Sequence, residues 1–119
     1  MMPTLQTNLY ELDFYDDYVV IMMKENQHLT LSVAKEIRPL LIQRFDQKSF
    51  VIINYRKFSH QVSPEVYCRD FFKNIRGIAI VSNNVTDKTI AAQEQLLFDQ
   101  SFAFFTSLET AKSWVQTLS

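Results

Sequence analysis

Apolar residues alternate with acidic ones in the first patterned segment of the chain, Leu9–Tyr15. This period of two is typical of a strand with one buried face. The next segment, Tyr18–Met23, is apolar throughout, and the polar pair Asp16-Asp17 separates the two. The pattern therefore predicts an antiparallel hairpin at the start of the fold. Residues 1–7 show no such pattern, and we expect them to form a flexible tail.

A helix is predicted after the hairpin, because four apolar residues recur there on one helical face: Ala34, Ile37, Leu41 and Phe45. Pro39 lies inside this pattern and removes one helical hydrogen bond. We therefore expect Pro39 to kink the helix or to cut it short.

Two continuous apolar runs follow, at Phe50–Tyr55 and Gly77–Val81. Such runs are typical of strands that are covered on both faces. Ser63-Pro64 predicts the start of a helix between them, with a hydroxyl at the cap and proline at the first helical position. We expect the lone glycine, Gly77, to relieve crowding in its strand or to mark a bulge.

Helix and strand continue to alternate to the end of the chain. Thr86 or Asp87 can cap a helix, Phe102–Phe105 is a short aromatic strand, and Ser107 can cap a last amphipathic helix. Strands that are joined through helices form parallel, right-handed βαβ units. We therefore expect one α/β domain over residues 1–119, with a mixed sheet of about five strands, an N-terminal antiparallel hairpin and about four packed helices.

The C-terminal segment Phe104–Val115 carries a family resemblance. It combines an aromatic strand, a capped turn and the helical pattern Leu-Glu-x-Ala-x-x-Trp-hydrophobic. This segment resembles the C-terminal helix of SpoIIAA-like domains, small bacterial proteins of the STAS (sulfate transporter and anti-sigma-factor antagonist) superfold. The order of predicted elements resembles theirs over nearly the whole chain.

The resemblance implies a regulatory domain without catalysis, which binds a protein partner or, in some relatives, a nucleotide or a lipid. Anti-sigma-factor antagonists carry a phosphorylated serine in an Asp-Ser-Ser-Gly-like motif that opens a helix after a central strand. The matching stretch here, Tyr55–Pro64, lacks that motif. Ser59 and Ser63 lie in this stretch, but neither belongs to such a motif. This departure puts a phosphoserine switch in doubt.

Composition excludes several kinds of chemistry. A single glycine rules out the Walker and Rossmann phosphate loops, which need several. The single cysteine, Cys68, cannot form an internal disulfide. One cysteine and two histidines are also too few for a zinc-type cluster. We expect Cys68 to be an inert thiol within a helix, and we expect no cofactor. No nucleophile–base pair or acidic dyad stands out, so we expect no enzymatic activity.

Hydropathy and cysteine content favour a cytoplasmic protein. No apolar run approaches the roughly 18 residues of a membrane span. The first residues also lack the basic and apolar regions of a signal peptide. We expect no nucleic-acid partner, and a homodimer through an exposed strand edge or a helix face remains open.

Charge is distributed unevenly along the chain, although the formal net charge is −1 at pH 7. Residues 1–26 carry five acids and one base, whereas residues 56–76 carry five bases and two acids. This distribution can be that of an ordinary surface, or it can steer an acidic partner towards the basic segment.

The main candidate site follows the strand Phe50–Tyr55, at its carboxyl end and before a predicted helix start. Open α/β sheets bind ligands at this position, because helix-end amides point there. Side chains here and at the end of the neighbouring strand can hold an anionic group: Arg56, Lys57, Ser59, His60, Ser63, Asn83 and Asn84.

Three interpretations of this stretch stay open. The leading hypothesis is a contact surface for a protein partner, and the alternative is a site for a small lipid or nucleotide ligand. The stretch can also be an ordinary surface loop in which Phe58 is tucked inward.

Overall fold

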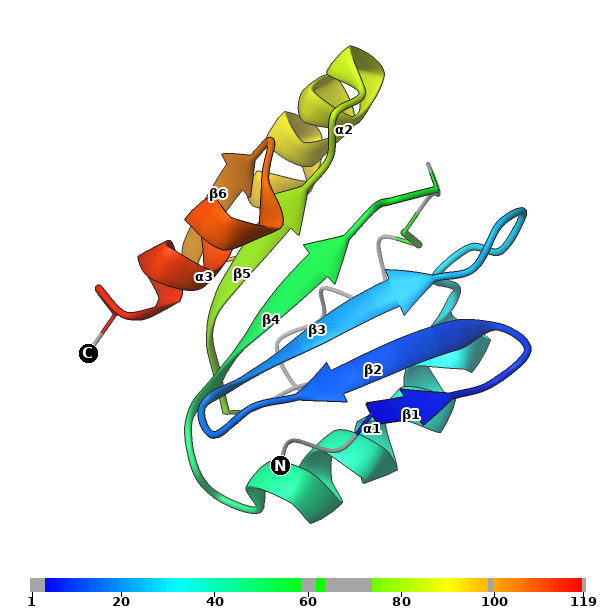
Figure 1. The fold of residues 1–119 in the computed structure, drawn as a ribbon, viewed down its shortest axis with the longest axis vertical. Helices are drawn as coiled ribbons and strands as arrows, with labels where there is room; N and C mark the ends of the chain where they lie inside the picture. Colours follow the sequence, from blue (N-terminus) through cyan, green and yellow to red (C-terminus); the bar gives the residue numbers. More distant parts are fainter. Residues whose placement is uncertain (1–3, 59–61, 64–73, 99, 119) are drawn as a thin grey trace.

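The computed structural model describes residues 4–58, 62–63, 74–98 and 100–118. These residues form a six-stranded sheet and three helices (Figure 1). The strands are β1 Thr4–Gln6, β2 Tyr10–Phe14, β3 Tyr18–Met23, β4 Phe50–Tyr55, β5 Ile75–Val81 and β6 Ser101–Phe105. The helices are α1 Leu31–Phe45, α2 Val85–Gln95 and α3 Leu108–Val115.

The strands lie in the sheet in the order in which they occur along the chain. β1, β2 and β3 pair antiparallel, whereas β3, β4, β5 and β6 pair parallel. The predicted mixed sheet, with an antiparallel start and parallel βαβ units, is therefore confirmed. The sheet has one strand more than expected. Residues 64–73 of the helix predicted to begin at Ser63-Pro64, Cys68 among them, lie outside the described residues.

The extra strand is β1, and it corrects the prediction of a flexible tail for residues 4–6, whereas residues 1–3 lie outside the described residues. Thr4–Gln6 pairs with β2 in a register that sets Leu5 opposite Leu12. The Thr4 hydroxyl also donates to Asp13 Oδ1 at 2.7 Å. A three-residue strand is too short to show a period of two, so only its pairing with β2 reveals it.

Helix α1 passes through Pro39 without ending there. Thr30 caps its first turn, because the Thr30 side chain accepts a hydrogen bond from the Val33 amide. The expected shortening of the helix is therefore wrong, and Pro39 lies on its exposed face. The predicted apolar stripe is confirmed, since all four of its members are buried: Ala34, Ile37, Leu41 and Phe45.

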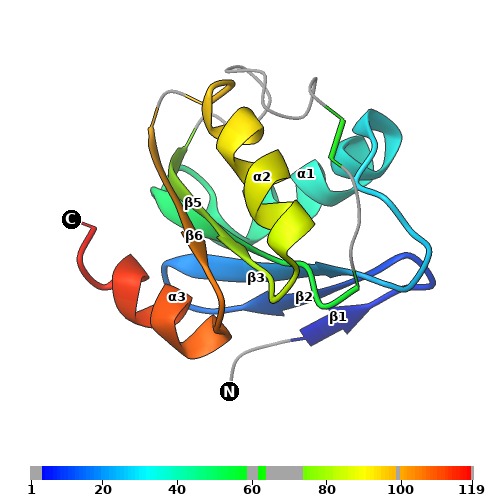
Figure 2. The ribbon, with the colours of Figure 1, turned by 90° about the horizontal axis from the view of Figure 1, so that it is seen from above.

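The helices cover both faces of the sheet (Figure 2). Between the sheet and the α1 and α2 side lies the larger core, which includes Leu12, Ile37 and Ile80. A smaller core under α3 includes Ile53 and Val115. Strands β3, β4 and β5 are therefore covered on both faces, as their continuous apolar runs predict.

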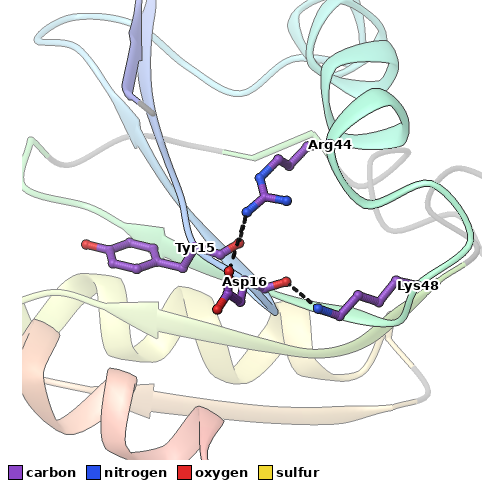
Figure 3. A network of polar contacts seen from close by, with 4 residues as sticks. All are labelled: Tyr15, Asp16, Arg44 and Lys48. Atoms are coloured by element: carbon purple, nitrogen blue, oxygen red, sulfur yellow. Dashed lines mark hydrogen bonds and ion pairs between the residues drawn. The ribbon is translucent and has the colours of Figure 1, made fainter. Parts of the chain in front are cut away.

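The turn between β2 and β3 is tied to the C-terminal end of α1 (Figure 3). Arg44 Nη2 donates to the carbonyl oxygen of Tyr15 at 3.0 Å, and Lys48 Nζ donates to that of Asp16 at 2.7 Å. An ion pair between Arg76 and Asp17 at 3.5 Å adds a contact from β5. These contacts hold the edge of the sheet at which the parallel strands begin.

Two turn residues other than glycine have a positive φ in the described part of the chain, Asn26 at 66° and Asp46 at 54°. Asp46 is the C-cap of α1, and its amide donates to the Ile42 carbonyl oxygen. Asparagine and aspartate tolerate this backbone region better than other residues with a side chain.

Gly77 lies beside a bulge in β5, where the α3 end packs closely on the strand. Phe50 pairs with Ile75 and Val51 with Gly77, so β5 has one extra residue at Arg76. A Cβ atom on Gly77 would lie 2.8 Å from Leu118 Cδ1 and 3.3 Å from Trp114 Cη2. The lone glycine therefore makes room for these two side chains.

Replacing Gly77 with alanine is expected to lower the free energy of unfolding by about 1 kcal/mol, at the low end for an overpacked core. The cost is small because Leu118 contacts the new methyl group through the tip of a flexible side chain. Urea denaturation measures this change. In a Leu118→Ala background the closest contact is absent, so the same substitution should cost less. Equal costs in both backgrounds would contradict this account of Gly77.

Candidate functional site

Strands β4, β5 and β6 end at the same edge of the sheet because they are parallel. A cleft of about 610 Å³ lies at this edge, and we call it the β4–β6 cleft. Three chain segments line it: Tyr55, Arg56 and Lys57 after β4; Val81, Ser82, Asn83 and Asn84 after β5; and Thr106, Ser107 and Leu108 after β6. Figure 1 shows α2 beginning just beyond the tip of β5.

Lys57 supplies an exposed cation to the β4–β6 cleft. Its ammonium nitrogen lies 5.7 Å from the centroid of the Phe58 ring. The ten lining residues include two cations, Arg56 and Lys57, and none of the ten is acidic. The lining therefore has a formal positive charge.

The turn from β5 into α2 is built by two polar side chains. Ser82 is buried, and its hydroxyl donates to Asp87 Oδ2 at 2.7 Å and accepts from the Asn84 amide at 3.0 Å. Asn84 is the N-cap of α2, since its side chain accepts from the Thr86 amide at 2.8 Å. These bonds fix the N-terminus of α2 at the cleft.

The turn from β6 into α3 places a second helix N-terminus at the same cleft. Ser107 caps α3 by accepting from the Thr110 amide at 3.1 Å. The amides of Leu108 and Glu109 lie in the first turn, so they have no acceptor within the helix itself. The two helices cover opposite faces of the sheet, yet both N-termini meet at the β4–β6 cleft (Figure 2).

Arg56 has a role that its sequence pattern does not indicate. Its side chain is fully buried and forms an ion pair of 2.5 Å with Glu94 of α2, which is also buried. Nε and Nη1 of Arg56 and Oε2 of Glu94 have no hydrogen-bond partner among the described residues. The Arg56 charge is therefore matched by a carboxylate inside the fold, and Lys57 is the exposed cation of the cleft.

The structure brings together four of the residues that the sequence singles out: Arg56, Lys57, Asn83 and Asn84. Ser63 is not among the residues that line the cleft, and its amide donates to the Leu29 carbonyl oxygen at 3.0 Å. Ser59 and His60 lie outside the described residues. Among the described residues, no three His, Cys, Asp or Glu side chains are grouped as a metal site requires.

Sequence reasoning missed the contribution from the end of β6, namely Thr106, Ser107 and Leu108. The signal was present, because Ser107 is a clear helix cap after a short strand. Applying the rule for carboxyl ends of parallel strands to β6 as well as β4 and β5 would have found it.

Comparison with known proteins identifies the fold. No protein-family model matches the chain, and no curated protein matches it either. The chain is similar to the crystal structure of an uncharacterized DUF3478-family protein with a SpoIIAA-like fold from Shewanella loihica PV-4. The TM-score is 0.62 at 16% sequence identity, and the alignment covers 93% of this chain and 98% of that one.

The chain therefore has a SpoIIAA-like fold, which confirms the resemblance seen in its C-terminal segment. At this sequence identity the likeness shows the fold alone. None of the helices in the described part of the chain has the length and apolar character needed to cross a bilayer.

Replacing Glu94 with glutamine is expected to lower the free energy of unfolding by about 3 kcal/mol, because Arg56 then stays buried without an anion. Urea denaturation of the variant measures the loss. The double variant Arg56→Met/Glu94→Leu removes both charges and should be closer to wild type than the single variant. If the loss in the double variant equals the sum of the losses in Arg56→Met alone and Glu94→Leu alone, the two side chains do not interact directly.

Proposed function

We propose that this chain is a non-catalytic, SpoIIAA-like regulatory module that binds a small anionic ligand in the β4–β6 cleft. One observation carries the proposal: Lys57 and the N-termini of α2 and α3 meet in a cleft whose described lining residues include no acid. The SpoIIAA-like fold supports a module of this kind.

The electrostatics of the cleft favour an anion. Each helix N-terminus acts as roughly half a positive charge and stabilises a nearby anion by about 0.3–1 kcal/mol at an exposed site. Two such termini act on the same space here, and each also carries one first-turn acid, Asp87 in α2 and Glu109 in α3. The Lys57 ammonium adds a full positive charge. A volume of about 610 Å³ is also that of a small-molecule site.

The lining supports binding in preference to catalysis. It supplies hydroxyl groups, side-chain amides and cations, and the described lining contains no histidine, cysteine or carboxylate. Histidine and carboxylates are the most common general bases, and a serine or threonine nucleophile needs such a base beside it. The residues that line the β4–β6 cleft are therefore suited to holding a ligand.

A protein partner is the second candidate, and one observation favours it. Leu96 and Leu97, at the C-terminal end of α2, are 86% and 49% exposed. Neighbouring exposed leucines are typical of contact surfaces between proteins. Native mass spectrometry of the purified chain separates the two candidates, since a bound small molecule adds its own mass and a partner adds that of a protein.

Sulfate and phosphate are expected to raise the melting temperature of the purified chain in a saturable way. A ligand that binds only the folded state stabilises it in proportion to the logarithm of its concentration above the Kd. Scanning fluorimetry against chloride at matched ionic strength measures this effect.

Two lysine variants locate the binding. Lys57→Ala should lose most of the saturable stabilisation, whereas Lys35→Ala removes an exposed cation from α1 and should keep it. General salt effects on folding act alike on both variants. Equal responses would place the anion outside the cleft, and no saturable response in the unmodified chain would reject the proposed function.

A further inference from the structure

The polar part of the β4–β6 cleft presents donors from separate elements. Lys57 comes from the end of β4, and the first-turn amides of Leu108 and Glu109 begin α3. The N-terminus of α2 approaches from the turn after β5. Donors that converge from several directions suit an anion with three terminal oxygens better than a flat carboxylate with two.

The charges around the cleft also bear on the class of anion that it can hold. Arg56 is a wall residue with a fully buried side chain, and within the described part of the chain its Nε and Nη1 have no acceptor. Glu94 is the buried carboxylate paired with it. The first turns of α2 and α3 each carry one acid, the buried Asp87 and the exposed Glu109. Because Glu94 offsets the charge of Arg56, the cation left for a ligand is Lys57. Lys57 and two helix N-termini at one cleft stabilise a dianion more than a monoanion.

Three of the ten lining residues give the cleft an apolar part. Val81 is buried, and Tyr55 and Leu108 are half-buried, so each of the last two keeps some surface open to solvent. Ligand sites commonly combine such a wall with a few polar groups that fix orientation. An apolar body attached to the anion would cover these side chains.

We infer that the β4–β6 cleft binds a soluble phosphate monoester that carries an apolar body. The phosphate group lies at the N-termini of α2 and α3 with Lys57, and the body lies against Tyr55 and Leu108. This inference rests on the proposed anion-binding function and names the class of ligand. A phosphate monoester has three terminal oxygens and close to two negative charges at neutral pH.

Isothermal titration calorimetry of the full chain at neutral pH tests the ligand class with three probes. Phenyl phosphate has both the dianion and the apolar body, phenyl sulfate has the same shape with one charge, and inorganic phosphate has no body. Phenyl phosphate is expected to bind about tenfold more tightly than either of the other two, because each lacks one set of contacts.

Two matched variants test the place of binding. Asn83→Asp adds a carboxylate to the exposed lining and should weaken phenyl phosphate binding about tenfold through like-charge repulsion. Gln93→Glu makes the same change of charge at an exposed position of α2 that does not line the cleft, and it should leave the affinity unchanged. Equal losses in the two variants would overturn the placement.

The outcomes separate this inference from the proposed function. If phenyl sulfate binds as tightly as phenyl phosphate and Asn83→Asp weakens both, the cleft binds anions but the phosphate monoester is wrong. If none of the probes binds, both proposals fail. If vesicles of equal parts phosphatidylcholine and phosphatidic acid bind the chain and phenyl phosphate does not, the phosphate belongs to a lipid headgroup and the soluble ligand is wrong.

Discussion

Parallel pairing of β3, β4, β5 and β6 is the constraint on which the rest of this structure depends. Between two parallel strands the chain must run back along the sheet before the second strand begins. Helix α1 makes this crossover between β3 and β4 and α2 makes it between β5 and β6, and both cover the same face. The same pairing sends three strand ends to one edge, where α2 and α3 begin. The cleft is thus a product of topology, and the side chains after each strand determine what it can hold.

At the end of β4 an apolar core residue and a buried charged residue lie close together in the chain. Ile53 is buried among apolar side chains, whereas Arg56 buries a charge just beyond the end of the same strand. Taking two ions out of water is expensive, so the pair with Glu94 is weak evidence for stability. Its effect is geometric, because it links the end of β4 to the last turn of the helix that begins at the cleft.

The sequence predicts those features of the fold that depend on local hydrophobic periodicity and on helix-capping residues. The two-sided burial of β4 and the cap at Ser107 follow from such patterns. The burial of Arg56 does not, because its partner Glu94 is distant in the chain and a run of bases indicates a surface. The two helix N-termini meet because α3 covers the opposite face of the sheet from α2. No local sequence pattern predicts which face a helix will cover.

The single glycine has a consequence for the unfolded chain. Glycine loses more backbone freedom on folding than any other residue. In the described part of the chain, Asn26 and Asp46 hold the turn positions with positive φ, and Gly77 is required by space in a strand. A denatured ensemble with almost no glycine is narrower, so folding this chain loses less backbone entropy than folding a glycine-rich one of equal length.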